Sequence, residues 1–284
     1  RIGAGGTSAI EALAQNAVNA TNSAYANSDI GPLELRLVHT EEVSYTESGD
    51  AVADIVALRR TDDGIMDEVH QIRDQFGADL VALLVDDFNA CGVAYLAPFN
   101  QEFGFSVTDT GCAVGNLTFA HEVGHNMGST HDRSNGSNSQ FPYGFGWRWD
   151  GTSGTQFRSV MAYQPGNRVP HFSNPGIAFD GVATGTPNDD NARVHDETRA
   201  SVAGFRQSVA PACVADTNGD GLLSPADFNA WILAFNTQSA GCDQNGDGQC
   251  SPADFNAWIV NYNAGCRTKR PPVGDRRTEG DRPC

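Results

Sequence analysis

Apolar residues recur with two different periods along the first part of the chain, and each period predicts a different secondary structure. Between residues 8 and 25 they fall three and four positions apart, and Ser8 begins a capping-box sequence, so we predict a long first helix. Leu33, Leu35 and Leu37 then alternate with polar residues, which predicts a half-buried strand.

A second helical pattern begins at Asp50 and continues until Gly77, which we expect to end it. The apolar run at 78–85 is rich in valine and leucine and predicts a central strand, and residues 92–97 and 105–108 predict two more strands. Helices that alternate with strands in this order predict an α/β fold, with long helices packed on a twisted, mostly parallel sheet.

The middle of the chain has a weaker pattern. Residues 133–157 are rich in serine, asparagine, glycine and aromatic residues without a clear period, and we expect a loop there. Residues 188–207 again have helical spacing and predict a closing helix. We therefore predict one large domain at 1–209, with an upper α/β subdomain at 1–131 and a smaller, irregular lower subdomain at 132–209.

The sequence HEVGHNMGSTH carries the most specific chemical signal in the chain. His121 and His125 are four residues apart, so on a helix both imidazoles can reach one metal ion. Glu122 is the candidate general base, because it can take a proton from a metal-bound water. Gly128 can adopt a positive φ, which ends the helix and returns His131 to the metal. Three neutral imidazoles leave the fourth position of a zinc ion open, which predicts one catalytic zinc.

A five-residue HExxH can occur by chance, but the eleven-residue pattern is far more specific. With Met161 downstream in the segment 159–163, it resembles the metzincin metalloproteases, whose zinc helix is followed by a tight methionine turn. An aspartate directly after the third histidine, here Asp132, resembles the reprolysin branch. A tyrosine two residues after the methionine, here Tyr163, resembles astacins and serralysins, in which that tyrosine can approach the zinc. Residues 1–209 resemble the peptidyl-Asp metalloendopeptidases and their bacterial reprolysin-like relatives.

This resemblance implies a secreted zinc endopeptidase that hydrolyses protein or peptide substrates. Met161, Gly128 and Asp132 would then be structural, and Tyr163 would be a second catalytic residue. The strand at 92–97 would be an edge strand that pairs with the substrate backbone, and the alternative is an ordinary edge strand. The competing function is a non-catalytic adhesion or binding protein on a protease scaffold, against which the intact acid and three histidines argue.

The resemblance also predicts what is cut, because peptidyl-Asp metalloendopeptidases cleave on the amino side of aspartate. In metzincins the wall of the pocket beside the zinc follows the methionine turn, which here is the segment 164–172. Its one cation, Arg168, could bind a substrate carboxylate through paired hydrogen bonds. The alternative is an apolar pocket with Arg168 in solvent.

Residues 210–266 contain an internal repeat. The segments 216–221 and 243–248 are copies offset by 27 residues, and the sequence SPADFNAWI follows both. Oxygen ligands at loop positions 1, 3, 5 and 12, a main-chain ligand at 7 and glycine at 6 form a calcium-loop pattern, although aspartate replaces the EF-hand glutamate at 12. The predicted ligands of two Ca²⁺ ions are Asp216, Asn218, Asp220, Leu222, Asp227, Asp243, Asn245, Asp247, Gln249 and Asp254.

This repeat resembles dockerin modules, because a helix is evident only after each loop. We therefore predict a small all-α dockerin-like domain at 210–266, with a cohesin-like or cell-surface protein partner. Plain Asx-Gly turns are the alternative. The segment 267–284 is polar, with six basic and three acidic residues, and we predict a disordered tail.

Composition adds limits on partners and compartment. The net charge of −17 argues against nucleic acid and anionic membranes as partners, and no apolar run is long enough to span a membrane. The seven cysteines form no CxxC pair, so we expect disulfides in a secreted protein. Cys91 and Cys112 flank two predicted strands and can bridge them, and Cys284 is the expected odd cysteine. Because the chain begins at Arg1 without a methionine, we expect a processed or truncated product that lacks its signal and pro-segments.

Overall fold

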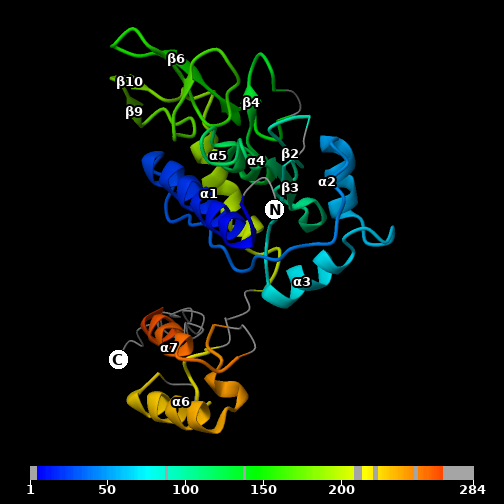
Figure 1. Ribbon diagram of the computed structural model, residues 1–284. Helices are drawn as coiled ribbons and strands as arrows, with labels where there is room; N and C mark the ends of the chain where they lie inside the picture. Colours follow the sequence, from blue (N-terminus) through cyan, green and yellow to red (C-terminus); the bar gives the residue numbers. More distant parts are fainter. Residues whose placement is uncertain are drawn as a thin grey trace, which may run out of the picture. The chain divides into compact units, whose positions relative to one another are not determined.

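The computed structural model describes residues 5–86, 89–136, 139–207, 213–219, 223–245 and 249–264. The chain divides into two compact units, Arg1–Ser208 and Val209–Cys284, and each is considered by itself (Figure 1). The predicted tail at 267–284, the cysteine at its end (Cys284) and three of the predicted calcium ligands lie outside the described residues; those ligands are Asp220, Leu222 and Asp247.

The helices of the first unit follow the hydrophobic spacing of the sequence. The single helical pattern after Asp50 forms two helices, of which the first is capped by Asp50 and the second ends at Gly77 in a left-handed conformation. The first helix begins before Ser8, so the predicted capping box does not form. The described helices are α1 (Thr7–Asn27), α2 (Ala51–Arg59), α3 (Glu68–Phe76), α4 (Thr118–Asn126) and α5 (Asn191–Val202).

Three strands form the main sheet, in the order β1 (Val81–Val85), β3 (Phe105–Asp109) and β2 (Gly92–Ala94). β1 is parallel to β3 and β2 is antiparallel to it. The prediction of a mostly parallel sheet is therefore wrong for the described strands, and β3 rather than β1 is central. The physical reason lies in the connections, because the short link that contains η1 (Gln101–Phe103) can join only antiparallel neighbours.

The predicted strand around Leu35 is also absent from the described structure. A side chain takes the place of a pairing strand: the amide of Asn22 donates to the Leu35 carbonyl at 2.8 Å and accepts from the Leu35 N–H at 2.7 Å. Leu33 and Leu37 still pack against buried core residues, as their alternation predicts.

Short strands shape the rest of the first unit, including parts of 133–157 that we expected to be loop. They form three small sheets, β4 with β5, the three-stranded β6–β7–β8, and β9 with β10. Their bounds are β4 (Thr130–Asp132), β5 (Phe145–Gly146), β6 (Arg148–Asp150), β7 (Gln156–Arg158), β8 (Asn167–Arg168), β9 (Ala178–Phe179) and β10 (Val182–Ala183).

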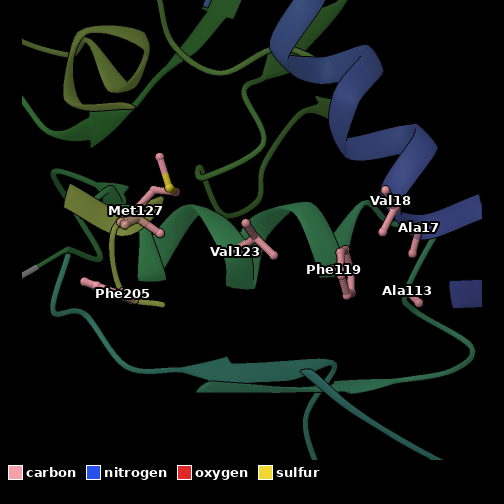
Figure 2. Packing of buried hydrophobic residues seen from close by; sticks show 8 residues of the cluster. Ala17, Val18, Ala113, Phe119, Val123, Met127 and Phe205 are labelled. Atoms are coloured by element: carbon pink, nitrogen blue, oxygen red, sulfur yellow. The ribbon is translucent and has the colours of Figure 1, made fainter. Parts of the chain in front are cut away.

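α4 lies at the centre of the hydrophobic core. It packs against α1 on one side and against β2 and β3 on another. Figure 2 shows Phe119, Val123 and Met127 spaced along α4, with Ala17 of α1 near one end and Phe205 near the other. The helix that carries the histidine motif is therefore held from several directions by apolar side chains.

Two disulfides join described cysteines. Cys91 and Cys112 are bridged as predicted, with their Cα atoms 5.5 Å apart, which ties the start of β2 to the turn before α4. Cys242 and Cys250 form a second bridge, and Cys213 is also disulfide-bonded.

The described part of the second unit contains the helices α6 (Pro225–Thr237) and α7 (Ala253–Ala264) and the short helix η2 (Ala240–Cys242). Trp231 and Trp258 are buried in the core of this unit, whereas Phe255 is 39% exposed. None of the described helices of the chain has the length and apolar character that crossing a bilayer requires.

We expect Phe172→Ala to destabilise the first unit by about 3–5 kcal/mol, because large-to-small changes in a core lose burial and leave a cavity. The Phe172 side chain is fully buried and stacks on Tyr25. The exposed Phe99 provides the control, and Phe99→Ala should change the unfolding free energy by less than about 0.5 kcal/mol. Urea titration measures both, and equal effects would contradict this description of the core.

Candidate metal centre

Three histidines converge at the end of α4. His121 and His125 lie on this helix, and His131 lies on β4. The Nε2 atom of His131 is 3.0 Å from that of His125 and 3.1 Å from that of His121. Tetrahedral zinc with Zn–N bonds of about 2.0–2.1 Å places two nitrogen ligands about 3.3 Å apart, so the cluster fits this ion closely. Among the described residues it is the one such group of potential metal ligands.

Main-chain carbonyls orient two of the imidazoles. His121 Nδ1 donates to the Val160 carbonyl at 2.8 Å, and His125 Nδ1 donates to the Ser129 carbonyl at 2.9 Å. Because these acceptors place the ring hydrogen on Nδ1, each Nε2 keeps a lone pair for a metal ion.

The histidines are also in the neutral state that metal binding requires. Burial, followed by the charges of His125 and Arg168, lowers the pKa of His121 far below its usual 6.5. Burial and the charge of His131 lower the pKa of His125 to about 3, and burial lowers that of His131. At neutral pH all three are therefore unprotonated ligands.

Two glycines allow the backbone to build this cluster. At Gly124 an added Cβ would lie 2.5 Å from the sulfur of the fully buried Met161, so only glycine lets α4 rest on the turn at 159–163. Gly128 has a φ of 98°, and the chain turns there from the end of α4 into β4, which carries His131.

Asp132 joins β4 to the methionine turn. It is buried, and its carboxylate accepts the Tyr163 N–H at 3.0 Å and pairs with the Arg148 guanidinium at 2.5 Å. These bonds hold the residue next to His131 in a fixed position.

Glu122 and His121 line the same pocket. The Glu122 carboxylate lies against Gly92 of β2, where an added Cβ would be 2.5 Å from Oε1, so the edge strand and the acid are in close contact. Burial raises the pKa of Glu122 to about 8, and the positive charge of Arg168 opposes this shift. The group can therefore both accept and release a proton near neutral pH.

The Tyr163 ring lies over the cluster. Its centroid is 4.0 Å from that of His131 and 5.8 Å from that of His121, and the side chain is 42% exposed. Burial and the neighbouring Glu122 carboxylate raise its pKa, so the hydroxyl stays protonated as a donor.

A pocket of about 520 Å³ lies beside the cluster and is lined by Glu122, Tyr163 and two arginines, Arg158 and Arg168. Arg168 donates to the carbonyl of Asn116 at 2.7 Å, so it is held at the pocket rather than in solvent. A larger, mostly apolar cavity of 700 Å³ lies beside segment 35–47, away from the three histidines.

Two features of this pocket are not evident from the sequence. Asparagine is a favoured capping residue, but Asn116 does not cap α4, because Leu117 takes the capping position in a left-handed conformation while the Asn116 amide donates to the Thr118 hydroxyl. Arg158 was not predicted at all. Nothing in its local pattern distinguishes it, since it reaches the pocket only through the pairing of β7 with β8.

The predicted calcium loops are partly described. In both repeats the carboxylate at position 12 is fully buried. Asp227 accepts N–H bonds from Ser224 at 2.8 Å and from Asn218 at 3.3 Å, and Asp254 accepts them from Ser251 at 2.7 Å and from Gln244 at 2.9 Å. The two copies thus use the same residue to join the loop to the start of its helix.

Comparison with known proteins shows that the sequence is similar to metallopeptidases. Residues 12–132 match the metallo-peptidase family M12B, reprolysin-like. A peptidyl-Asp metalloendopeptidase of Stenotrophomonas maltophilia (strain R551-3) is 38% identical over 69% of this chain, and one of Pseudomonas fragi is 29% identical over 66%. The match covers 48% of the first relative and 99% of the second, so the chain spans about half the length of the first relative.

A solved structure supports the fold alone. One chain of "Structure of a chaperone-substrate complex" superposes on 71% of this chain with a TM-score of 0.56 and 24% identity, over 33% of its own length. The first unit is thus similar to metallopeptidases in sequence and shares a fold with a solved protein.

We predict that the chain binds about one equivalent of zinc through His121, His125 and His131. His131→Ala should lower the affinity for zinc by at least tenfold, because two imidazoles hold the ion less well than three. His70, which lies on α3 outside the cluster, provides the control His70→Ala. Metal analysis after dialysis measures the bound zinc, and an unchanged content in His131→Ala would remove that residue from the site.

Proposed function

Because residues 12–132 match the reprolysin-like metallopeptidases, we propose that this chain is a secreted zinc endopeptidase. One observation carries the proposal: the converging imidazoles of His121, His125 and His131 stand beside an acid, Glu122, that opens into the same pocket. A structural zinc site uses four protein ligands, whereas this cluster offers three and leaves room for water and substrate.

His121, His125 and His131 would hold the zinc, which would supply Lewis-acid polarisation of the peptide carbonyl and of the attacking water. Glu122 would take the proton from the attacking water and pass it to the amine that leaves when the peptide bond breaks. Burial raises its pKa to about 8, which favours the second transfer, and the positive charge of Arg168 favours the carboxylate needed for the first. The single acid therefore serves as base and then as acid.

Tyr163 is suited to a supporting role in the same step. Its ring lies 4.0 Å from that of His131, and its hydroxyl stays protonated. In our proposal it donates to the substrate oxygen that gains negative charge as water adds to the carbonyl. Met161, Gly128 and Asp132 keep the ligands in place through the packing and hydrogen bonds described above.

The relatives named peptidyl-Asp metalloendopeptidases support a preference for aspartate. We propose that the pocket beside the histidines accepts this side chain and that Arg168 binds its carboxylate. The guanidinium is held at the pocket by the Asn116 carbonyl, which suits a fixed, charge-assisted contact. The β2 edge, whose Gly92 touches Glu122, is the proposed place for the substrate backbone.

Secretion is supported by the disulfides, which persist in oxidising compartments. The competing function, a non-catalytic binding protein on this scaffold, is disfavoured by the intact acid and ligands. Chelator-sensitive cleavage of a protein substrate distinguishes the two functions, because only the endopeptidase would show it.

For the second unit we propose a calcium-binding, dockerin-like module that attaches the enzyme to a cohesin-like or cell-surface protein. The support is the exact repeat SPADFNAWI and the equivalent bonding of Asp227 and Asp254 in the two copies. The described core consists of a few aromatic residues around Trp231 and Trp258, so bound calcium would contribute folding free energy.

We expect Glu122→Gln to lower kcat by about 10²- to 10⁴-fold with zinc content unchanged, because the amide cannot accept the proton from water. Glu102, which is exposed on η1, provides the matched control Glu102→Gln. Casein cleavage with and without a chelator measures the activity. If wild type cleaves nothing, the binding-protein function is favoured; if Glu122→Gln keeps full activity, another group is the base.

We predict that the full chain binds two Ca²⁺ ions and that Asp216→Ala and Asp243→Ala each remove one. Position 1 of a calcium loop supplies a charged ligand, whose loss weakens the site. The Glu122→Gln background prevents self-cleavage, and the exposed Asp62 provides the control Asp62→Ala. Calorimetric titration after EGTA treatment measures the number bound, and no calcium uptake by the parent chain would refute the calcium loops.

A further inference from the structure

Three arginines stand side by side across the small sheet β6–β7–β8. In the register of this sheet Arg148 faces Arg158, and Arg158 faces Arg168. Residues directly opposite one another in neighbouring strands project from the same face, and like charges in such positions destabilise a sheet. A row of three cations therefore needs compensating negative charge.

Only the first arginine of this row has an acidic partner among the described residues. Arg148 pairs with the Asp132 carboxylate at 2.5 Å. Arg158 donates to the carbonyls of Gly166 and Ala162, at 2.8 and 2.7 Å, and forms no ion pair with a described residue.

Arg168 is in the same situation. It donates to the carbonyls of Asn116 and Ala162, at 2.7 and 3.4 Å, and forms no ion pair with a described residue. Its Nε is buried and finds no acceptor in the described part of the chain. Main-chain carbonyls orient both guanidinium groups, but they leave two positive charges without a counter-ion.

Both unpaired cations lie at the pocket beside the histidines. Arg158 is 6% exposed, and burial, followed by the charge of Arg148, lowers its pKa. Burial, followed by the charge of Arg158, lowers the pKa of Arg168 to about 10, so this group stays protonated at neutral pH. Removing two cations from water without a partner costs free energy that a bound anion recovers.

Glu122 does not fill this need. It lines the same pocket but forms no ion pair with either arginine within the described structure. The pocket of about 520 Å³ thus offers fixed donors and positive charge to a ligand.

We propose that Arg158 and Arg168 act together as a two-guanidinium subsite for the side-chain carboxylate of the substrate residue that follows the scissile bond. This rests on the proposed function in one respect, that the ligand is a peptide. Arg168 contacts the carboxylate, and Arg158 supplies a second, buried charge and fixes the neighbouring strand. The subsite therefore selects a carboxylate over the amide of the same shape.

The roles of Arg158 and Arg168 can be tested with two peptides that are identical except for the residue after the scissile bond, which is Asp in one and Asn in the other. In wild type we expect kcat/KM to be about 10- to 100-fold higher for the Asp peptide, since hydrogen bonds to charged groups are the stronger ones. Arg158→Gln and Arg168→Gln should each bring the ratio to within about threefold of one, whereas Arg158→Lys, which keeps the charge, should retain part of it. Arg193, which pairs with Glu197 on α5, provides the control Arg193→Gln, with an unchanged ratio.

The ratio within one variant cancels a general loss of activity or folding. If Arg158→Gln keeps the wild-type ratio while Arg168→Gln loses it, the pair is refuted. If wild type cleaves both peptides equally, the subsite is refuted although the endopeptidase function stands.

Binding provides a second readout that does not need turnover. Glu122→Gln should bind the Asp peptide at least tenfold more tightly than the Asn peptide, and adding Arg158→Gln should remove the difference. If wild type cleaves no peptide but this Arg158-dependent binding is observed, the subsite stands and the proposed activity falls. Equal binding of the two peptides would overturn the subsite.

Discussion

The first unit depends on the contact between α4 and the turn at 159–163. Gly124 rests on the Met161 sulfur with no room for a Cβ, and the Val160 carbonyl accepts the His121 Nδ1 hydrogen. One packing contact and one hydrogen bond thus place two distant segments so that the imidazole has a single useful orientation. Phe172 and Tyr25, which stack in the core behind this turn, extend the same support to α1. A metal ligand on a rigid, buried helix loses little entropy when it binds.

The pocket beside the histidines is positively charged, although the protein as a whole is acidic. The chain carries a net charge of −17, yet the pocket beside the histidines is lined by Arg158 and Arg168. Long-range steering cannot attract an acidic ligand to such a molecule, so any preference for a carboxylate must come from short-range contacts in a desolvated pocket. Asp132 neutralises Arg148 in the same row and leaves the other two guanidinium groups for a ligand. A selective site can therefore exist on a surface that would repel the same ligand at a distance.

The second unit is stabilised by different means. Its described core centres on two tryptophans, and a disulfide between Cys242 and Cys250 lies beside it. In each copy of the repeat one buried aspartate accepts the N–H of the serine before the helix and an N–H of the preceding loop. Units with so small a core need cross-links or bound ions, and calcium bound at the two loops would serve this purpose in our proposal.

The sequence by itself determined the features that depend on neighbours a few residues apart. The spacing of His121 and His125 places both on one face of a helix, and the apolar periods predict α1, α2, α3 and α5, because helix geometry is local. The order of the sheet, the absence of a strand around Leu35 and the failure of Asn116 to cap α4 were decided by tertiary structure. The row of arginines was decided in the same way, since Arg148, Arg158 and Arg168 come together only through strand register. Pairing between distant segments depends on how the whole chain packs, and no local period encodes it.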